Sequence, residues 1–208
     1  MITNETNQAE LSGKVLEEPK PSHSIYGESF FTFPLEVPRL SGHVDVLPVI
    51  LSEKLLARTG IGEGARIGLR GQLRSYNRII EGNSRLELKI FAKEMYDSPE
   101  GECINQMEMT GFLCKPPIYR TTPFGREITD MLVAVNRSYN KSDYIPTIAW
   151  GRNARMAKNL PVGQKIQVEG RIQSREYEKL LESGERIRRI AYEVSAASLL
   201  LQEPPARE

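Results

Sequence analysis

One sequence pattern occurs twice in this chain, and the repeat constrains its fold more than any other feature. The segment Asn7–Gly13 (NQAELSG) recurs 98 residues later as Asn105–Gly111 (NQMEMTG). The same shift holds at Pro19/Pro117, Val37/Val135 and Asp45/Asp143, and it grows by one residue at Gly71/Gly170 and Ser75/Ser174. A repeat of about 100 residues has the length of a small domain rather than of a solenoid unit. The sequence therefore predicts two copies of one fold, over residues 4–97 and 104–202.

The two halves differ in charge, although the whole chain carries a net charge of only +1. Residues 1–103 hold 12 Lys and Arg against 15 Asp and Glu, a net charge of −3. Residues 104–208 hold 16 against 12, a net charge of +4. This asymmetry favours an anionic partner for the second half, with scattered surface charge as the alternative.

Several function classes find no support in the sequence. The two cysteines, Cys103 and Cys114, do not make a disulfide framework, so we expect reduced thiols and a cytoplasmic protein. The two histidines, His23 and His43, lack neighbouring ligands, so no metal is expected. No secretory leader, no membrane-spanning run and no catalytic motif is found, so we expect no membrane association, no cofactor and no enzymatic activity.

Short apolar runs between Gly and Pro predict strands in repeat 2. The predicted elements are strands over 106–114, 128–137, 143–150, 166–177 and 187–196, with one helix over 151–160. Along the fourth strand Ile166, Val168 and Ile172 alternate with polar residues, which is typical of a half-buried strand. Repeat 1 follows the same pattern, with strands over 67–78 and 85–91. Five strands with a helix between the third and fourth predict an all-β protein of two tandem OB-folds, which are five-stranded Greek-key barrels.

Repeat 2 also carries motifs that are specific to one family. These are Val133–Tyr139 (VAVNRSY), Ser142–Pro146 (SDYIP), Ala149–Gly151 (AWG) and Gly170–Tyr177 (GRIQSREY). At these positions the sequence resembles the bacterial single-stranded DNA-binding protein family, over nearly all of residues 104–202. Repeat 1 resembles the family more weakly, mainly at Gly71–Ser75 (GQLRS).

The resemblance implies a nucleic-acid interface on repeat 2. In the family, bases stack on four aromatic positions, which correspond here to Tyr139, Tyr144, Trp150 and Tyr177. Stacking tolerates any base and contributes about 1–3 kcal/mol per base. Cations close to these aromatics would hold phosphates; they are Arg137, Lys141, Arg152, Arg171 and Arg175. The predicted activity is sequence-independent binding of single-stranded DNA in replication, repair or recombination.

Repeat 1 lacks the aromatic set. Ser41, Val46 and Ser52 stand where repeat 2 has Tyr139, Tyr144 and Trp150, and Arg78 stands in place of Tyr177. Arg74, Tyr76 and Arg78 lie on one predicted strand face and would offer a partial substitute. We therefore expect repeat 1 to bind DNA weakly or to serve mainly in assembly.

Two further expectations follow from the resemblance. The family assembles four OB-folds, which for a tandem chain implies a homodimer. Family members often end in an acidic, aromatic tip that recruits other proteins, whereas this sequence ends QEPPARE. We therefore expect DNA coverage without that tip, or recruitment through another surface.

Two alternative functions remain open from the sequence alone. An OB-fold interaction module of a primosome-like assembly would use the same fold, although it would not need the full aromatic set. Single-stranded RNA is the other alternative, because stacking surfaces do not exclude a 2′-hydroxyl.

Overall fold

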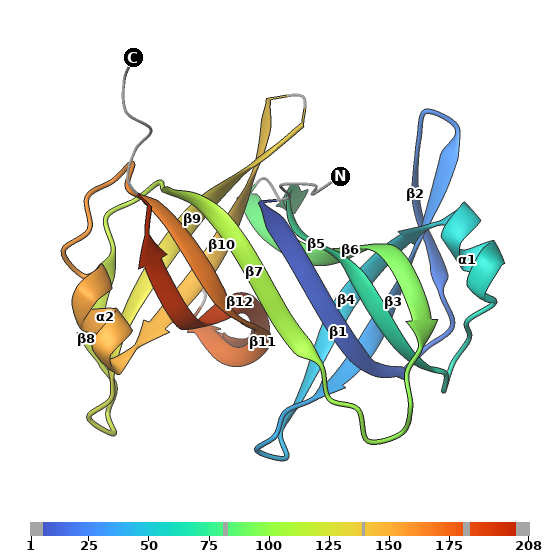
Figure 1. Cartoon of the computed structure of the whole chain (residues 1–208), viewed down its shortest axis with the longest axis horizontal. Coiled ribbons are helices and arrows are strands. Elements are labelled where there is room, and N and C mark those ends of the chain that lie inside the picture. The colour runs from blue at the N-terminus through green and yellow to red at the C-terminus, as the bar shows by residue number, and fades with distance from the viewer. Residues whose placement is uncertain (1–5, 81–82, 139, 181–183, 203–208) are drawn as a thin grey trace.

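The computed structural model describes residues 6–80, 83–138, 140–180 and 184–202. Repeat 1 contains β1 (Asn7–Val15), β2 (Lys20–Ile25), β3 (Glu28–Pro38), β4 (Val44–Ser52), α1 (Glu53–Thr59), β5 (Arg66–Ile80) and β6 (Asn83–Asp97). Repeat 2 contains β7 (Asn105–Leu113), β8 (Ile118–Thr121), β9 (Glu127–Arg137), β10 (Lys141–Trp150), α2 (Gly151–Ala157), β11 (Lys165–Leu180) and β12 (Arg186–Leu201). Figure 1 shows the two repeats side by side, each with its short helix on the outer flank.

Each repeat closes into a barrel. In repeat 1, β1 pairs with both β3 and β5, and β4 pairs in parallel with β6. Repeat 2 has the same pairings, because β7 bonds to β9 and β11, and β10 runs parallel to β12. Alternate side chains of these strands fill each barrel, among them Leu11, Phe33 and Leu69 in repeat 1 and Val133, Ile145 and Ile172 in repeat 2. The five-stranded barrel with one helix confirms the predicted all-β fold of two OB-folds.

The first strands of the two repeats join the barrels into one sheet. β1 and β7 pair antiparallel, and Ala9 lies opposite Met107, its own counterpart in the repeat. A pseudo-twofold axis therefore passes between these two residues. The resulting sheet has twelve strands in the order β2-β3-β4-β6-β5-β1-β7-β11-β12-β10-β9-β8.

A reciprocal pair of buried aspartates fastens the barrels to each other away from the axis. Asp45 of repeat 1 accepts hydrogen bonds from the Ser174 backbone N–H (2.6 Å) and hydroxyl (2.9 Å) in repeat 2. Its counterpart Asp143 accepts from the Ser75 backbone N–H (2.7 Å) in repeat 1. Both aspartate side chains are fully buried. The repeated Asp and Ser positions therefore lock the domains together.

The sequence pattern missed two strands and the length of four others. All residues of β2 and β8 are exposed, so these strands carry no apolar alternation to reveal them. β5, β6, β11 and β12 extend past their predicted ends. Residues 81–82 and 181–183, which join β5 to β6 and β11 to β12, lie outside the described part of the chain. No helix among the described residues is long and apolar enough to cross a membrane.

Candidate nucleic-acid interface

Trp150 lies at the junction between β10 and α2, where a helix cap would ordinarily be. In repeat 1 the equivalent residue, Ser52, caps α1 by accepting a hydrogen bond from the Leu55 N–H (3.3 Å). Trp150 occupies the N-cap position of α2 and makes no such bond. Losing a serine cap typically costs about 1 kcal/mol of stability. Repeat 2 therefore forgoes a stabilising contact in order to place an indole at this point.

The indole is held in a fixed orientation on the outer face of repeat 2. Its Nε1 donates a hydrogen bond to the Ser195 hydroxyl on β12 (3.1 Å), and the ring is half-buried. A partly exposed ring whose N–H already has a partner is suited to stacking against a planar ligand.

A pocket of about 580 Å³ opens beside Trp150. Arg171 on β11 and Arg126 in the β8–β9 turn both line it, together with Asn105, Gly170, Ser195, Ala196 and Ala197. A side chain at Gly170 could not fit, because its Cβ would lie 2.1 Å from the Ser195 carbonyl oxygen. The absence of a side chain at this bulge lets the paired backbones of β11 and β12 approach closely beside the pocket. One aromatic and two arginine side chains thus line an open hollow.

Tyr144 lies on the same face of β10 as Trp150. The pairing of β9 with β10 continues without a bulge from Lys141 to Trp150, so residues an even number apart share a face. Tyr144 is 41% exposed, while Ile145 and Ala149, on the opposite face, are fully buried. The two rings predicted to stack therefore point outward from one strand.

The outer face of β11 continues this surface. Arg171, Arg175 and Tyr177 alternate with residues that point the other way, as the sequence predicted. The Arg175 guanidinium carbon lies 5.8 Å from the centre of the Tyr177 ring, and Arg171 is exposed. Lys141 and Arg152 are also exposed, at the start of β10 and on α2.

Arg137 differs from the other predicted contacts because it faces the domain junction. It lies on the same side of β9 as the buried Val133 and Val135. Its Nε is 3.3 Å from the buried Asp143 carboxylate, and only 23% of its side chain is exposed. Its main contact is therefore structural. The predicted Tyr139 lies outside the described residues.

Arg126 was not among the residues predicted from the sequence to contact DNA. The residue follows Gly125, whose φ of 74° makes the turn between β8 and β9. The Arg126 N–H bonds to the Thr122 hydroxyl (3.1 Å), which fixes the position of the backbone in this turn. The RTTPFGR segment was visible in the sequence, but only the fold shows that the turn lies beside Trp150.

In repeat 1 the three predicted residues lie along β5 with different exposures. Arg78 is 67% exposed and lies 3.6 Å from Glu87. Tyr76 is half-buried, and burial raises the pKa of its hydroxyl. The Arg74 guanidinium is stacked over Phe91, 3.9 Å from the ring centre. Tyr76 therefore lies, half-buried, between a stacked arginine and an exposed one.

No group of three or more metal-binding side chains exists among the described residues.

Comparison with known proteins places the chain in a family. A family model described as "Single-strand binding protein family" matches residues 104–201. Single-stranded DNA-binding protein A of Bacillus subtilis is 33% identical over 108 residues, which cover 49% of this chain and 60% of that protein. Single-stranded DNA-binding protein 2 of Staphylococcus aureus strain Mu50 is 32% identical over 108 residues, and the match covers 74% of its length.

A solved structure shares the fold of the whole chain. The wild-type single-stranded DNA binding protein of Thermus aquaticus aligns with a TM-score of 0.77 over 97% of this chain and 96% of its own, at 22% sequence identity. The chain spans 60% and 62% of the length of the Bacillus subtilis protein and of a second Staphylococcus aureus relative, from strain COL. These matches, together with the OB-folds and the aromatic face, show that the chain belongs to the single-strand binding protein family.

Proposed function

We propose that this protein binds single-stranded DNA without sequence preference, through the outer face of repeat 2. The observation that carries the proposal is the arrangement of Trp150, Arg126 and Arg171 around one open pocket. An aromatic ring between two cations can stack a base while it holds the neighbouring phosphates. The names of the relatives support the same ligand.

Residue roles follow from exposure and position. Trp150, Tyr144 and Tyr177 would stack bases, and Tyr139 is proposed to do so from the resemblance alone. Arg126, Arg171, Arg175, Lys141 and Arg152 would contact phosphates, whereas Arg137 would mainly hold Asp143. The protein acts by binding rather than catalysis, and the proposed setting is replication, repair or recombination in the cytoplasm.

Salt dependence tests the phosphate contacts. Affinity for single strands falls as salt rises, and a plot of log affinity against log salt becomes shallower by about 0.7 for each phosphate contact that is lost. Replacing Arg126 and Arg171 by glutamine should therefore flatten the slope by about 1.4. A titration of labelled oligothymidine at four salt concentrations measures it, and matched RNA oligomers tell whether DNA is preferred. An unchanged slope in a folded variant would remove both arginines from the interface.

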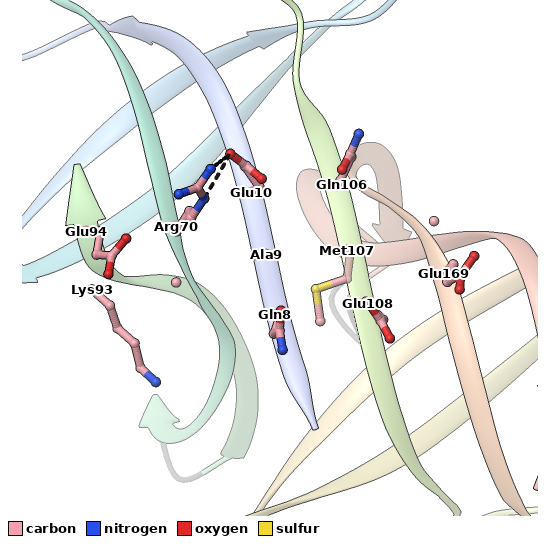
Figure 2. Close-up of a pocket in the computed structure, with 12 residues that line it drawn as sticks. Gln8, Ala9, Glu10, Arg70, Lys93, Glu94, Gln106, Met107, Glu108 and Glu169 are labelled. Carbon is pink, nitrogen blue, oxygen red and sulfur yellow. Dashed lines mark hydrogen bonds and ion pairs between the residues drawn. The ribbon is translucent and has the colours of Figure 1, made fainter. Parts of the chain in front are cut away.

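We further propose that repeat 2 supplies most of the affinity and that two chains assemble into four OB-folds. The face available for assembly is the outer side of the central sheet around β1 and β7, where a hollow of about 670 Å³ lies between charged side chains. Figure 2 shows Glu10 paired with Arg70 on one side of the axis and Glu108 and Glu169 on the other. In a second copy, the side that carries Arg70 and Lys93 would then lie against Glu108 and Glu169.

Sedimentation equilibrium tests this assembly. The wild-type mass should correspond to two chains. Replacing Glu108 and Glu169 together by lysine should shift the mass towards one chain, because like charges would then meet across the interface. A dimer that is unaffected by this reversal would place the interface elsewhere, and a wild-type monomer would refute the assembly.

A further inference from the structure

In repeat 1, aromatic residues on the strands next to β4 lie near the position that corresponds to Trp150. Trp150 lies opposite Ile128 on β9 and bonds to Ser195 on β12. In repeat 1 the equivalent three positions are Ser52, Phe30 and Phe91. The small residue and the aromatic ring have exchanged strands. Aromatic side chains therefore flank the same place on both barrels, although no aromatic residue aligns with Trp150.

These rings form a continuous series in repeat 1. His23 on β2 stacks on Phe30, with ring centres 5.1 Å apart and planes inclined by 13°. Phe30 lies 6.1 Å from Phe91, and the Arg74 guanidinium covers Phe91 at 3.9 Å. His23 is exposed, Phe91 and Arg74 are half-exposed, and Phe30 is nearly buried. Both ends of the series can therefore reach a ligand, one through an imidazole and one through a guanidinium plane.

The strands beside Phe91 carry an unusual arrangement of charge. Lys89 lies directly opposite Arg74, and Arg85 lies directly opposite Arg78, on the outer face of the β5–β6 hairpin. Like charges placed opposite each other destabilise a sheet. Glu87 is the one carboxylate between these pairs on the hairpin face and lies near Arg78, and the buried Asp143 of repeat 2 also interacts with the charge of Arg74. Four cations on so small an area are expected where an anion binds.

Repeat 2 shows that the fold does not require these cations. The pair equivalent to Arg74 and Lys89 is Gln173 and Glu193, which share a hydrogen bond of 2.8 Å. A hydrogen-bonded amide–carboxylate pair without any cation therefore occupies the same two positions of the same fold. The cationic pair is a property of repeat 1 alone.

We propose that the series His23–Phe30–Phe91–Arg74 and the cations beside it form a second contact for single-stranded DNA, on repeat 1. The inference rests on the proposed function, since the ligand is the same. Bases would stack on the exposed imidazole and on the Arg74–Phe91 pair, while Lys89, Arg78 and Arg85 hold phosphates. Repeat 1 thus binds single-stranded DNA through residues that do not align with the aromatic residues of repeat 2.

Two variants test this contact. Phe91→Ser introduces the residue that repeat 2 carries at the equivalent position. Lys89→Gln with Arg85→Gln removes one cation from each like-charged pair. Each variant is titrated with an oligothymidine of about 12 nucleotides, the span of one OB-fold, and with one of about 35, more than the span of two. Trp150 fluorescence reports occupancy of repeat 2 in every titration.

Phe91→Ser should weaken binding of the long oligomer about tenfold, the contribution of one stacked base. Quenching of Trp150 by the short oligomer should stay at its wild-type midpoint. The double variant should flatten the salt slope for the long oligomer by about 1.4. It should also raise the thermal midpoint by about 1–2 °C, because it relieves like-charge repulsion. Lys54→Gln with Arg58→Gln, which removes the same charge from exposed positions on α1, is the matched control and should leave binding unchanged.

Long-oligomer binding that is unchanged in both variants would overturn the inference and leave the ring series as packing. A parallel loss of Trp150 quenching by the short oligomer would also overturn it, because the effect would then spread to repeat 2. A wild-type protein that binds neither oligomer would instead refute the proposed function itself.

Discussion

Replacing Trp150 and Tyr177 together by alanine is expected to weaken the binding of oligothymidine at least thirtyfold. Each stacked base contributes about 1–3 kcal/mol, so two contribute at least about 2 kcal/mol. Trp150 lines one pocket with Arg126 and Arg171, and the Arg175 guanidinium lies 5.8 Å from the centre of the Tyr177 ring. Fluorescence anisotropy of a labelled oligomer measures the loss.

The matched control keeps the rings and changes their chemistry. Replacing Trp150 and Tyr177 by phenylalanine retains a π-face at both positions and should retain most of the affinity. The alanine variant must keep its native circular dichroism, since Trp150 also bonds to Ser195. If it stays folded and binds like the wild type, the aromatic residues have a structural role and the stacking assignment is wrong.

The second large effect concerns stability. Replacing Asp45 by asparagine is expected to lower the free energy of unfolding by about 3–5 kcal/mol, because it breaks a buried, hydrogen-bonded ion pair. Both Asp45 oxygens accept from Arg39 at 2.6 Å, and Oδ1 also binds Ser174 of the other domain. The loss corresponds to a fall in the thermal midpoint of roughly 10 °C. Calorimetry and urea titration measure it.

The repeat provides a control for this variant. Burial raises the pKa of Asp143, and the Ser75 N–H and the charges of Arg137 and Arg74 offset this only in part. Its Oδ2 has no hydrogen-bond partner in the structure. Asparagine at position 143 keeps an acceptor for the Ser75 N–H and removes a poorly paired buried charge. Asp143→Asn should therefore cost much less than Asp45→Asn. Equal losses would show that the two junctions are energetically alike.

The effect of pH on the Asp45 variant follows from the direction of its pKa. Burial opposes the charged carboxylate, but hydrogen bonds from Arg39 and Ser174 outweigh it and lower the pKa of Asp45. The stabilisation is therefore fully present above the unfolded pKa of about 4 and is lost as the pH falls through the lower folded pKa. The difference between wild type and Asp45→Asn should be constant near pH 7 and shrink below about pH 4. A difference that grows on acidification would contradict this.

Periodicity predicted the barrel strands but not the strands without a buried face. The alternation through Ile166, Val168 and Ile172 places β11 correctly, because these side chains fill the barrel. β2 and β8 have exposed side chains throughout and are held by backbone pairing alone. A hydrophobic pattern identifies strands that have a buried face, so it cannot identify strands whose side chains are all exposed.

The sequence predicted those features of the site that depend on the spacing of residues along a single strand. The shared face of Tyr144 and Trp150 follows from an even spacing and a strand without a bulge. The place of Arg126 beside Trp150 depends on how a turn packs across the barrel, which no local pattern contains. Arg137 lies near the aromatic residues in sequence, yet its side chain points to the opposite face of its strand.

Aligning the two repeats residue by residue does not reveal the aromatic residues that lie near the Trp150 position in repeat 1. Comparing Ser52 with Trp150 shows a lost aromatic, whereas the structure shows Phe30 and Phe91 on either side of Ser52. Substitutions on neighbouring strands can compensate for each other because a sheet face is shared among strands. Such exchanges become visible only when the strand register is known.

Fluorescence of Trp150 during addition of oligothymidine, at low and at high salt, tests the central claim most directly. It is the only tryptophan in the chain, so the signal reports the repeat 2 face alone. Saturable quenching that shifts to higher oligomer concentration as salt rises is the predicted result. A folded protein whose Trp150 emission does not respond to the oligomer at either salt concentration would contradict the account.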